Sequence, residues 1–113
     1  MEKRKIKRRH IIYYLKVFDS ETDLLLGQLV NITTDGFQMV GEEPIAPGIG
    51  LDLKMQLPEK IHNKKIINFN AECMWCKRDV NPSYFSTGFE YRDISKDDLN
   101  IINSLIYDFS FHD

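Results

Sequence analysis

Apolar and polar residues alternate with a period of two along most of this chain, in runs short enough to be single strands. Between residues 49 and 57 every second residue is apolar, and most residues between them are polar or charged. Because successive side chains of a strand point to opposite faces, this alternation predicts a strand with one buried face. Similar runs occupy residues 11–18, 24–32, 37–40, 67–75 and 85–91. Six short strands with hairpin-length connections predict a mainly all-β fold, either an antiparallel barrel or a sandwich.

The same alternation predicts which side chains form the core, because the apolar members of each run should share the buried face. The predicted core members include Leu24, Leu26, Val30 and Ile32 in the second run, Ile49 at the start of the fourth, and Trp75 at the end of the fifth.

Turn-forming residues separate the runs. Asp35-Gly36 is the strongest hairpin signal, because glycine readily takes the positive φ that tight hairpin turns require. Further connections, polar or containing proline, are predicted at residues 19–23, 44–48, 58–65 and 78–83.

The end of the chain changes to a helical period. Ser95 is suited to cap a helix N-terminus, and Asp98 follows three residues later. One apolar face would then be formed by Leu99, Ile102, Leu105, Ile106 and Phe109. We expect a helix over about residues 95–110 that packs this face on the strands.

The length and composition predict one domain, over residues 11–113, preceded by an arm. The chain has 113 residues, of which 42% are hydrophobic and 28% charged, as is usual for one globular domain. The apolar run nearest the start, residues 11–15, is too short for a signal peptide or a membrane span. We therefore expect a cytoplasmic protein.

The arm, residues 1–10, is strongly basic. It holds six Lys or Arg residues and one Glu, whereas the rest of the chain holds nine basic and sixteen acidic residues. Such an asymmetry is found both in solvated tails and in segments that bind an anion.

Residues suited to catalysis or metal binding are few. Cys73 and Cys76 have C-x-x-C spacing, but residues three apart in a strand should point to opposite faces, and a structural zinc site needs four ligands. His10, His62 and His112 are widely separated in the sequence. We therefore expect no enzyme, no metal and no cofactor.

Two short motifs suggest a binding site. Arg4 and Arg8 form an R-x-x-x-R pattern, and Lys5 and Arg9 repeat its spacing. Residues 31–36 read N-x-T-x-x-G, in which Asn31 and Thr33 would share the outer face of a strand. The arm leads directly into the first strand, so it could fold across that polar pair.

The ordered pair of motifs, within this strand pattern, resembles the PilZ domain family. The resemblance continues through residues 26–30, 44–48, 73–75 and 86–91, and so covers nearly the whole chain. It implies a six-stranded antiparallel β-barrel with a C-terminal α-helix that binds cyclic di-GMP, the bacterial second messenger, and then changes conformation or exposes a surface to a downstream protein.

The resemblance also assigns the site. The implied ligand-binding residues are Arg4, Arg8, Asn31, Thr33 and Gly36, with Lys5, Arg9 and Trp75 as further candidates. Arginine can form a fork to guanine or to phosphate oxygens, and an amide or a hydroxyl can hydrogen-bond to either. Asn31 and Thr33 replace the Asp and Ser that are commoner in the family's second motif. Two alternatives are a PilZ-like module that binds only protein and a small nucleic-acid-binding barrel.

Overall fold

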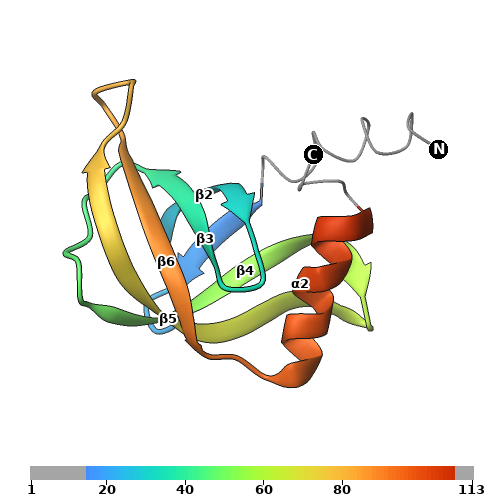
Figure 1. The fold of residues 1–113 in the computed structure, drawn as a ribbon. Coiled ribbons are helices and arrows are strands. Elements are labelled where there is room, and N and C mark those ends of the chain that lie inside the picture. Colours follow the sequence, from blue (N-terminus) through green and yellow to red (C-terminus); the bar gives the residue numbers. More distant parts are fainter. Residues whose placement is uncertain (1–14, 109–113) are drawn as a thin grey trace.

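Six antiparallel strands close into a barrel (Figure 1). The computed structural model describes residues 15–108. Its strands are β1 (Lys16–Asp19), β2 (Leu25–Ile32), β3 (Gly36–Gly41), β4 (Gly50–Ile61), β5 (Lys64–Arg78) and β6 (Phe85–Asp93). They follow one another around the barrel in the order β1-β2-β3-β6-β5-β4, and β4 closes it by pairing with β1. The predicted six-stranded barrel is confirmed.

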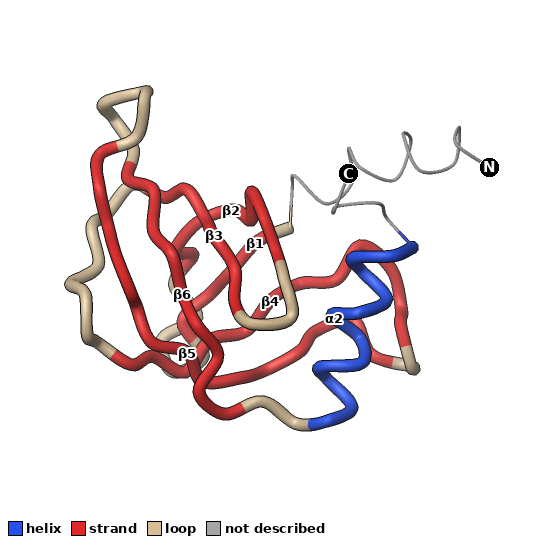
Figure 2. The backbone as a smooth tube through the Cα atoms, viewed as in Figure 1, coloured by secondary structure: helices blue, strands red, loops and turns tan. Residues whose placement is uncertain are grey.

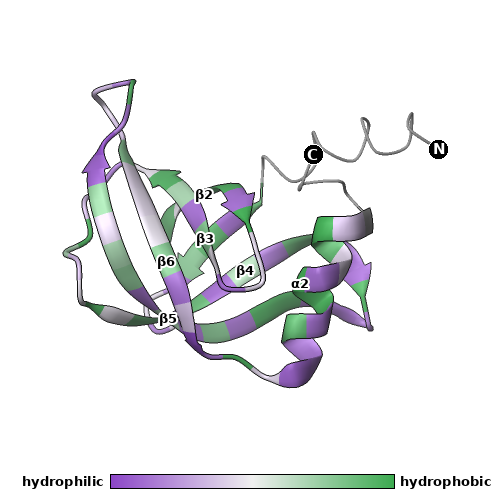
Figure 3. Ribbon diagram, in the orientation of Figure 1, coloured by the Kyte–Doolittle hydropathy of each residue, from purple (hydrophilic) through white to green (hydrophobic). Residues whose placement is uncertain are grey.

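The alternating pattern fills the barrel with apolar side chains, and Figure 3 shows the alternation along the strands. Leu29, Met39, Leu53 and Met55 have no exposed surface. Burial of each such side chain contributes about 1.5–3 kcal/mol to the free energy of unfolding. Aromatic rings extend this core, for example the stacked pair Phe37 and Phe89, whose ring centroids are 5.0 Å apart.

Two register shifts move several residues away from their predicted positions. The first lies in β2, between Leu29 and Asn31. Because one extra residue in a strand reverses the facing of those that follow, Leu29 is buried, whereas Val30 is only half-buried. The core prediction for residues 24–32 is correct for Ile32, and Leu26 is half-buried and packs against the core. It is wrong for Leu24, which is exposed, and for Val30, which is half-buried.

The second shift lies in β5, between Cys73 and Trp75, and it turns Trp75 outward. Trp75 is 38% exposed, so its predicted core position is wrong. Cys76 correspondingly packs against the core into which Cys73 is buried, so the expectation that the two thiols face opposite sides is also wrong. Both thiols are free, and burial raises the pKa of Cys73. Ile49, before the start of β4, is exposed as well.

The predicted loop at residues 58–65 is mostly strand. β4 continues to Ile61 and β5 starts at Lys64, so two residues join them (Figure 2). His62 and Asn63 have φ angles of 49° and 68°, the left-handed conformation of the turns that fit two-residue hairpins. Pro58 is accommodated because the pairing of β4 with β5 is irregular at this end.

The C-terminal helix, α2 (Lys96–Asp108), confirms the predicted change of period. The backbone N–H of Asp98 donates to Ser95 Oγ at 3.1 Å, which is the expected cap. The helix buries Ile101, Ile102, Leu105 and Ile106 in the same core as the barrel. Phe109, the last predicted member of this face, lies outside the described residues. The described residues contain no helix with the length and hydrophobicity needed to span a bilayer.

An ion-pair cluster ties the start of α2 to the β4–β5 hairpin. Lys64 Nζ lies 2.7 Å from Asp98 Oδ1 and 3.4 Å from Asp97 Oδ2, and His62 Nδ1 lies 3.3 Å from Asp97 Oδ1. The hydrogen bond to Asp98 raises the pKa of Lys64, and the hydrogen bond from His62 lowers the pKa of Asp97.

Replacing Lys64 by Met should lower the thermal midpoint of unfolding, because it leaves the nearly buried Asp98 carboxylate without its cation. Lys65→Met, next to it and fully exposed, is the matched control and should change little. Folding lowers the pKa of Asp97 below its usual 3.8, so its carboxylate adds to the free energy of unfolding at neutral pH. This addition is lost in acid, as the pH falls from 3.8 through the lowered pKa. Equal midpoints for the two lysine variants would show that the cluster does not hold α2.

Gly36→Ala should destabilise the protein by about 1–3 kcal/mol in denaturant titration, because overpacking against backbone cannot relax easily. A Cβ at Gly36 would lie 1.9 Å from the carbonyl oxygen of Phe89 on β6. Gly50→Ala is the control, since its nearest neighbour would be 3.9 Å away. Gly36 therefore permits the close approach of β3 to β6. Its φ is not positive, so the conformation predicted for it from the Asp35-Gly36 pair is wrong.

Candidate ligand-binding site

The N-x-T-x-x-G motif occupies the end of β2 and its turn into β3. Asn31 and Thr33 are both exposed, as predicted, whereas Gly36 is buried between strands. The Oδ1 atom of Asn31 accepts a hydrogen bond from the N–H of Ile32 at 3.0 Å. Within residues 15–108 the Asn31 carboxamide makes no other hydrogen bond, so its NH2 group is available to a ligand.

Thr33 organises the turn. Its Oγ1 accepts hydrogen bonds from the backbone N–H groups of Asp35 and Gly36, at 3.1 and 3.3 Å, and lies 3.3 Å from the carbonyl oxygen of Gly36, to which it can donate. The backbone N–H of Thr33 donates to that same oxygen at 2.8 Å. A threonine placed in this way fixes the loop that follows Asn31, a role that the sequence pattern alone does not distinguish from ligand contact.

A row of side chains crosses four strands on the outer face of the barrel. Asn31 of β2 pairs with Gln38 of β3, Gln38 with Gly88 of β6, and Gly88 with Trp75 of β5. Gly88 has no side chain, and the indole of Trp75 lies directly over it: a Cβ there would be 2.3 Å from Trp75 Nε1. The row thus joins an amide at one end to a half-exposed aromatic ring at the other.

This row forms part of a shallow cavity of about 250 Å³. Asn31, Thr33 and Gly36 line it, and so does Trp75, so the structure brings four of the predicted residues together. Sequence reasoning missed eight further lining residues, of which four are not buried: Asp35, Gln38, Met74 and Glu90. Asp35 lies inside the motif itself, but the other three are recognised only from strand pairing, and Met74 is the residue at the β5 register shift.

The described part of the site is not strongly basic. Arg92 lies beside the cavity, but its Nε is 2.8 Å from Glu72 and its Nη1 bonds Glu90. The hydrogen bond to Glu90, followed by that to Glu72, raises the pKa of Arg92. Lys77 Nζ lies 5.5 Å from the centroid of the Trp75 ring. Because these carboxylates offset the charge of Arg92, Lys77 is the remaining cation of the described chain beside the ring, and a ligand with two phosphates would need further positive charge from elsewhere.

Arg4, Lys5, Arg8 and Arg9 lie outside the described residues. The described chain begins at Leu15, whose carbonyl oxygen accepts a hydrogen bond from the N–H of Leu29 at 2.8 Å. The described chain therefore begins beside β2, at a point two residues away from Asn31 along that strand.

Comparison with known families agrees with this fold. A sequence model of the PilZ domain matches residues 2–108. The chain therefore belongs to the PilZ domain family.

Two solved structures share the fold. The inhibitor of motility MotI/DgrA from Bacillus subtilis superposes with a TM-score of 0.63 and 21% identity, over 85% of this chain and 44% of that one. The PlzA protein of Borreliella burgdorferi, solved in complex with c-di-GMP, superposes with a TM-score of 0.57 and 6% identity, over 95% of this chain and 49% of that one. The chain thus spans about half the length of each. No curated protein sequence matches it.

Gly88→Ala should displace Trp75 and shift its fluorescence emission to longer wavelength, because the ring would lose its contact with the strand and enter water. Trp75 is the one tryptophan of the chain, so emission reports this site alone. The destabilisation should be smaller than for Gly36→Ala, because the obstructing group is a half-exposed side chain and not backbone. An emission spectrum identical to that of the wild type and of Gly50→Ala would contradict the placement of the indole on Gly88.

Proposed function

We propose that this PilZ domain is a non-catalytic, cytoplasmic receptor for cyclic di-GMP, bound between the outer cavity and the basic arm. The observation that carries the proposal is the joint position of Asn31 and Trp75 in one cavity, near Leu15, where the described chain begins. Family membership and the c-di-GMP complex of PlzA support the same ligand.

The chemistry of the cavity suits a guanine base. The ring of Trp75 offers a flat face for stacking, which is worth about 1–3 kcal/mol per base in nucleotide-binding proteins. The NH2 group of Asn31, at the other end of the row, can donate to an acceptor on the base edge or on a phosphate. Thr33 and Gly36 contribute by shaping the turn that carries Asn31.

The cavity can hold only part of a cyclic dinucleotide. Pockets that enclose a whole ligand of drug size have volumes of about 300–1,000 Å³, whereas this one has about 250 Å³ and is shallow. The rest of the ligand, including its two phosphates, therefore needs a second surface. Arg4 and Arg8 supply forked, permanently charged groups suited to guanine or phosphate oxygens.

The division between cavity and arm links binding to an output. A ligand held by both would fix the arm over the cavity that Asn31 and Trp75 line, and so change the surface that a downstream protein meets. We infer that this change, within bacterial second-messenger signalling, is the function of the domain.

Isothermal titration should show tighter binding of cyclic di-GMP than of GMP, because two linked guanines engage cavity and arm together. Arg4→Ala and Arg8→Ala should each weaken binding by about 1–3 kcal/mol, as expected for a bidentate contact to guanine, and Trp75→Ala by a similar amount for the lost stacking. Lys60→Ala is the matched control, since it removes one exposed positive charge outside both the arm and the cavity.

Parallel losses for Lys5→Ala and Arg9→Ala, with none for Arg4→Ala and Arg8→Ala, would move the motif by one residue. Absence of binding at high micromolar ligand would refute the receptor and favour a module that binds only protein. Tight, steeply salt-dependent binding of random duplex DNA, with no preference for cyclic di-GMP, would identify a nucleic-acid-binding barrel instead.

A further inference from the structure

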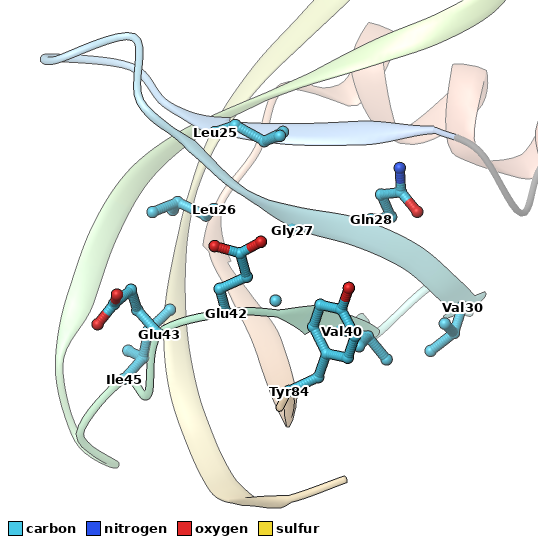
Figure 4. A pocket seen from close by; sticks show the side chains of 11 residues that line it. Leu25, Leu26, Gly27, Gln28, Val30, Val40, Glu42, Glu43, Ile45 and Tyr84 are labelled. Carbon is cyan, nitrogen blue, oxygen red and sulfur yellow. The ribbon is translucent and has the colours of Figure 1, made fainter. Parts of the chain in front are cut away.

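A second, larger concavity lies on the outer face of β2 and β3, and we call it the acidic groove. It has a volume of about 670 Å³ and is lined by both strands, the β3–β4 loop and Tyr84 (Figure 4). Its apolar surface comes from Leu25, Leu26, Val30, Val40 and Ile45. Leu25 is 53% exposed, and contiguous exposed apolar surface of this kind is typical of a site that another segment or molecule covers.

The groove carries negative charge only. Glu42 and Glu43 line it, and none of the eleven lining residues, all within the described part of the chain, is basic. Neither carboxylate has an ion pair within residues 15–108. An occupant of matching chemistry would combine an apolar side chain with flanking lysines or arginines.

The basic arm has that chemistry. Ile6 stands between Lys5 and Lys7, and arginines follow at residues 8 and 9. The described chain begins next to the groove, because the carbonyl oxygen of Leu15 accepts from the N–H of Leu29, whose neighbours Gln28 and Val30 are lining residues. Ten residues can extend over about 33 Å, which exceeds the roughly 20 Å covered by the six residues of β2 along the groove.

The acidic groove and the ligand-binding cavity share one pair of strands. Gln28 pairs with Val40 in the groove, and Asn31 pairs with Gln38 in the cavity, with the β2 register shift between them. One tethered arm can therefore reach either site. Because Ile6 lies between Arg4 and Arg8 in the sequence, placing Ile6 in the groove competes with holding both arginines at the cavity.

We propose that the arm docks in the acidic groove when no ligand is bound, with Ile6 on the apolar surface and its lysines near Glu42 and Glu43. Cyclic di-GMP then draws the arm to the cavity and uncovers the groove, a step that rests on the proposed function. Exposed ion pairs are weak individually, but the tether holds the arm at a high effective concentration. The docked state is therefore populated and still reversible, as a switch requires.

The docked state competes with ligand binding, which gives a measurable consequence. The apparent affinity of a ligand falls by the fraction of protein in the competent state. Neutralising the groove with Glu42→Gln/Glu43→Gln should therefore tighten cyclic di-GMP binding by about 2- to 30-fold, as expected for the loss of two exposed ion pairs. The gain should shrink at high salt, because screening weakens the docked state of the wild type as well.

A direct test uses a zero-length carbodiimide cross-linker on the full-length chain, with mass spectrometry to locate the joined residues. Cross-links from Lys3, Lys5 or Lys7 should go to Glu42 or Glu43 without ligand and disappear with saturating cyclic di-GMP. The Glu21→Gln/Glu59→Gln variant removes two exposed carboxylates outside the groove and is the matched control; it should keep these cross-links and the wild-type affinity. Cross-links spread evenly over exposed carboxylates, or unchanged affinity in the groove variant, would overturn the proposal.

The two proposals fail separately. Groove cross-links in a protein that does not bind cyclic di-GMP would refute the receptor and retain the docked arm. Normal binding of cyclic di-GMP without groove cross-links would retain the receptor and refute the docked arm.

Discussion

Closure of the barrel depends on the four residues of β1. Val17 pairs with Gly27 of β2 on one side and with Met55 of β4 on the other, and its side chain is completely buried. Without this short strand, β2 and β4 would each present an unpaired edge to other chains. β1 is also the first strand after the segment to which we assign ligand binding, so the element that closes the barrel follows that segment closely in the sequence.

The strands and the helix are predictable from the sequence because their signal is repetitive. Leu53, Met55 and Leu57 are buried as their alternation predicts, and Ser95 caps α2 as its side chain predicts. A register shift leaves no such signal, since one additional Val30 or Met74 is an ordinary strand residue. The predictions therefore fail by a single step at these points, and each error reverses the face on which the following side chains lie.

The site shows the same division. Asn31 and Thr33 could be placed from their spacing, but the cavity exists because the β5 shift turns Trp75 to the outside and because Gly88 leaves room for its ring. The hairpin at His62-Asn63 was also unpredictable, because neither residue is glycine although both take a positive φ. What the sequence could not supply in each case was the pairing of one strand with its neighbour.

The contact between Trp75 and Gly88 restricts how this surface can evolve. A side chain at position 88 would collide with the indole of Trp75 in its present place. Glycine at position 88, in contrast, leaves room for either a large or a small residue at position 75. If Trp75 is replaced first, a side chain at position 88 no longer meets the indole. If Gly88 is replaced first, the protein that still contains Trp75 has a displaced ring. The two positions should co-vary among relatives, with an aromatic residue at the first found together with glycine at the second, and that covariation would mark the members of the family that keep a stacking surface here.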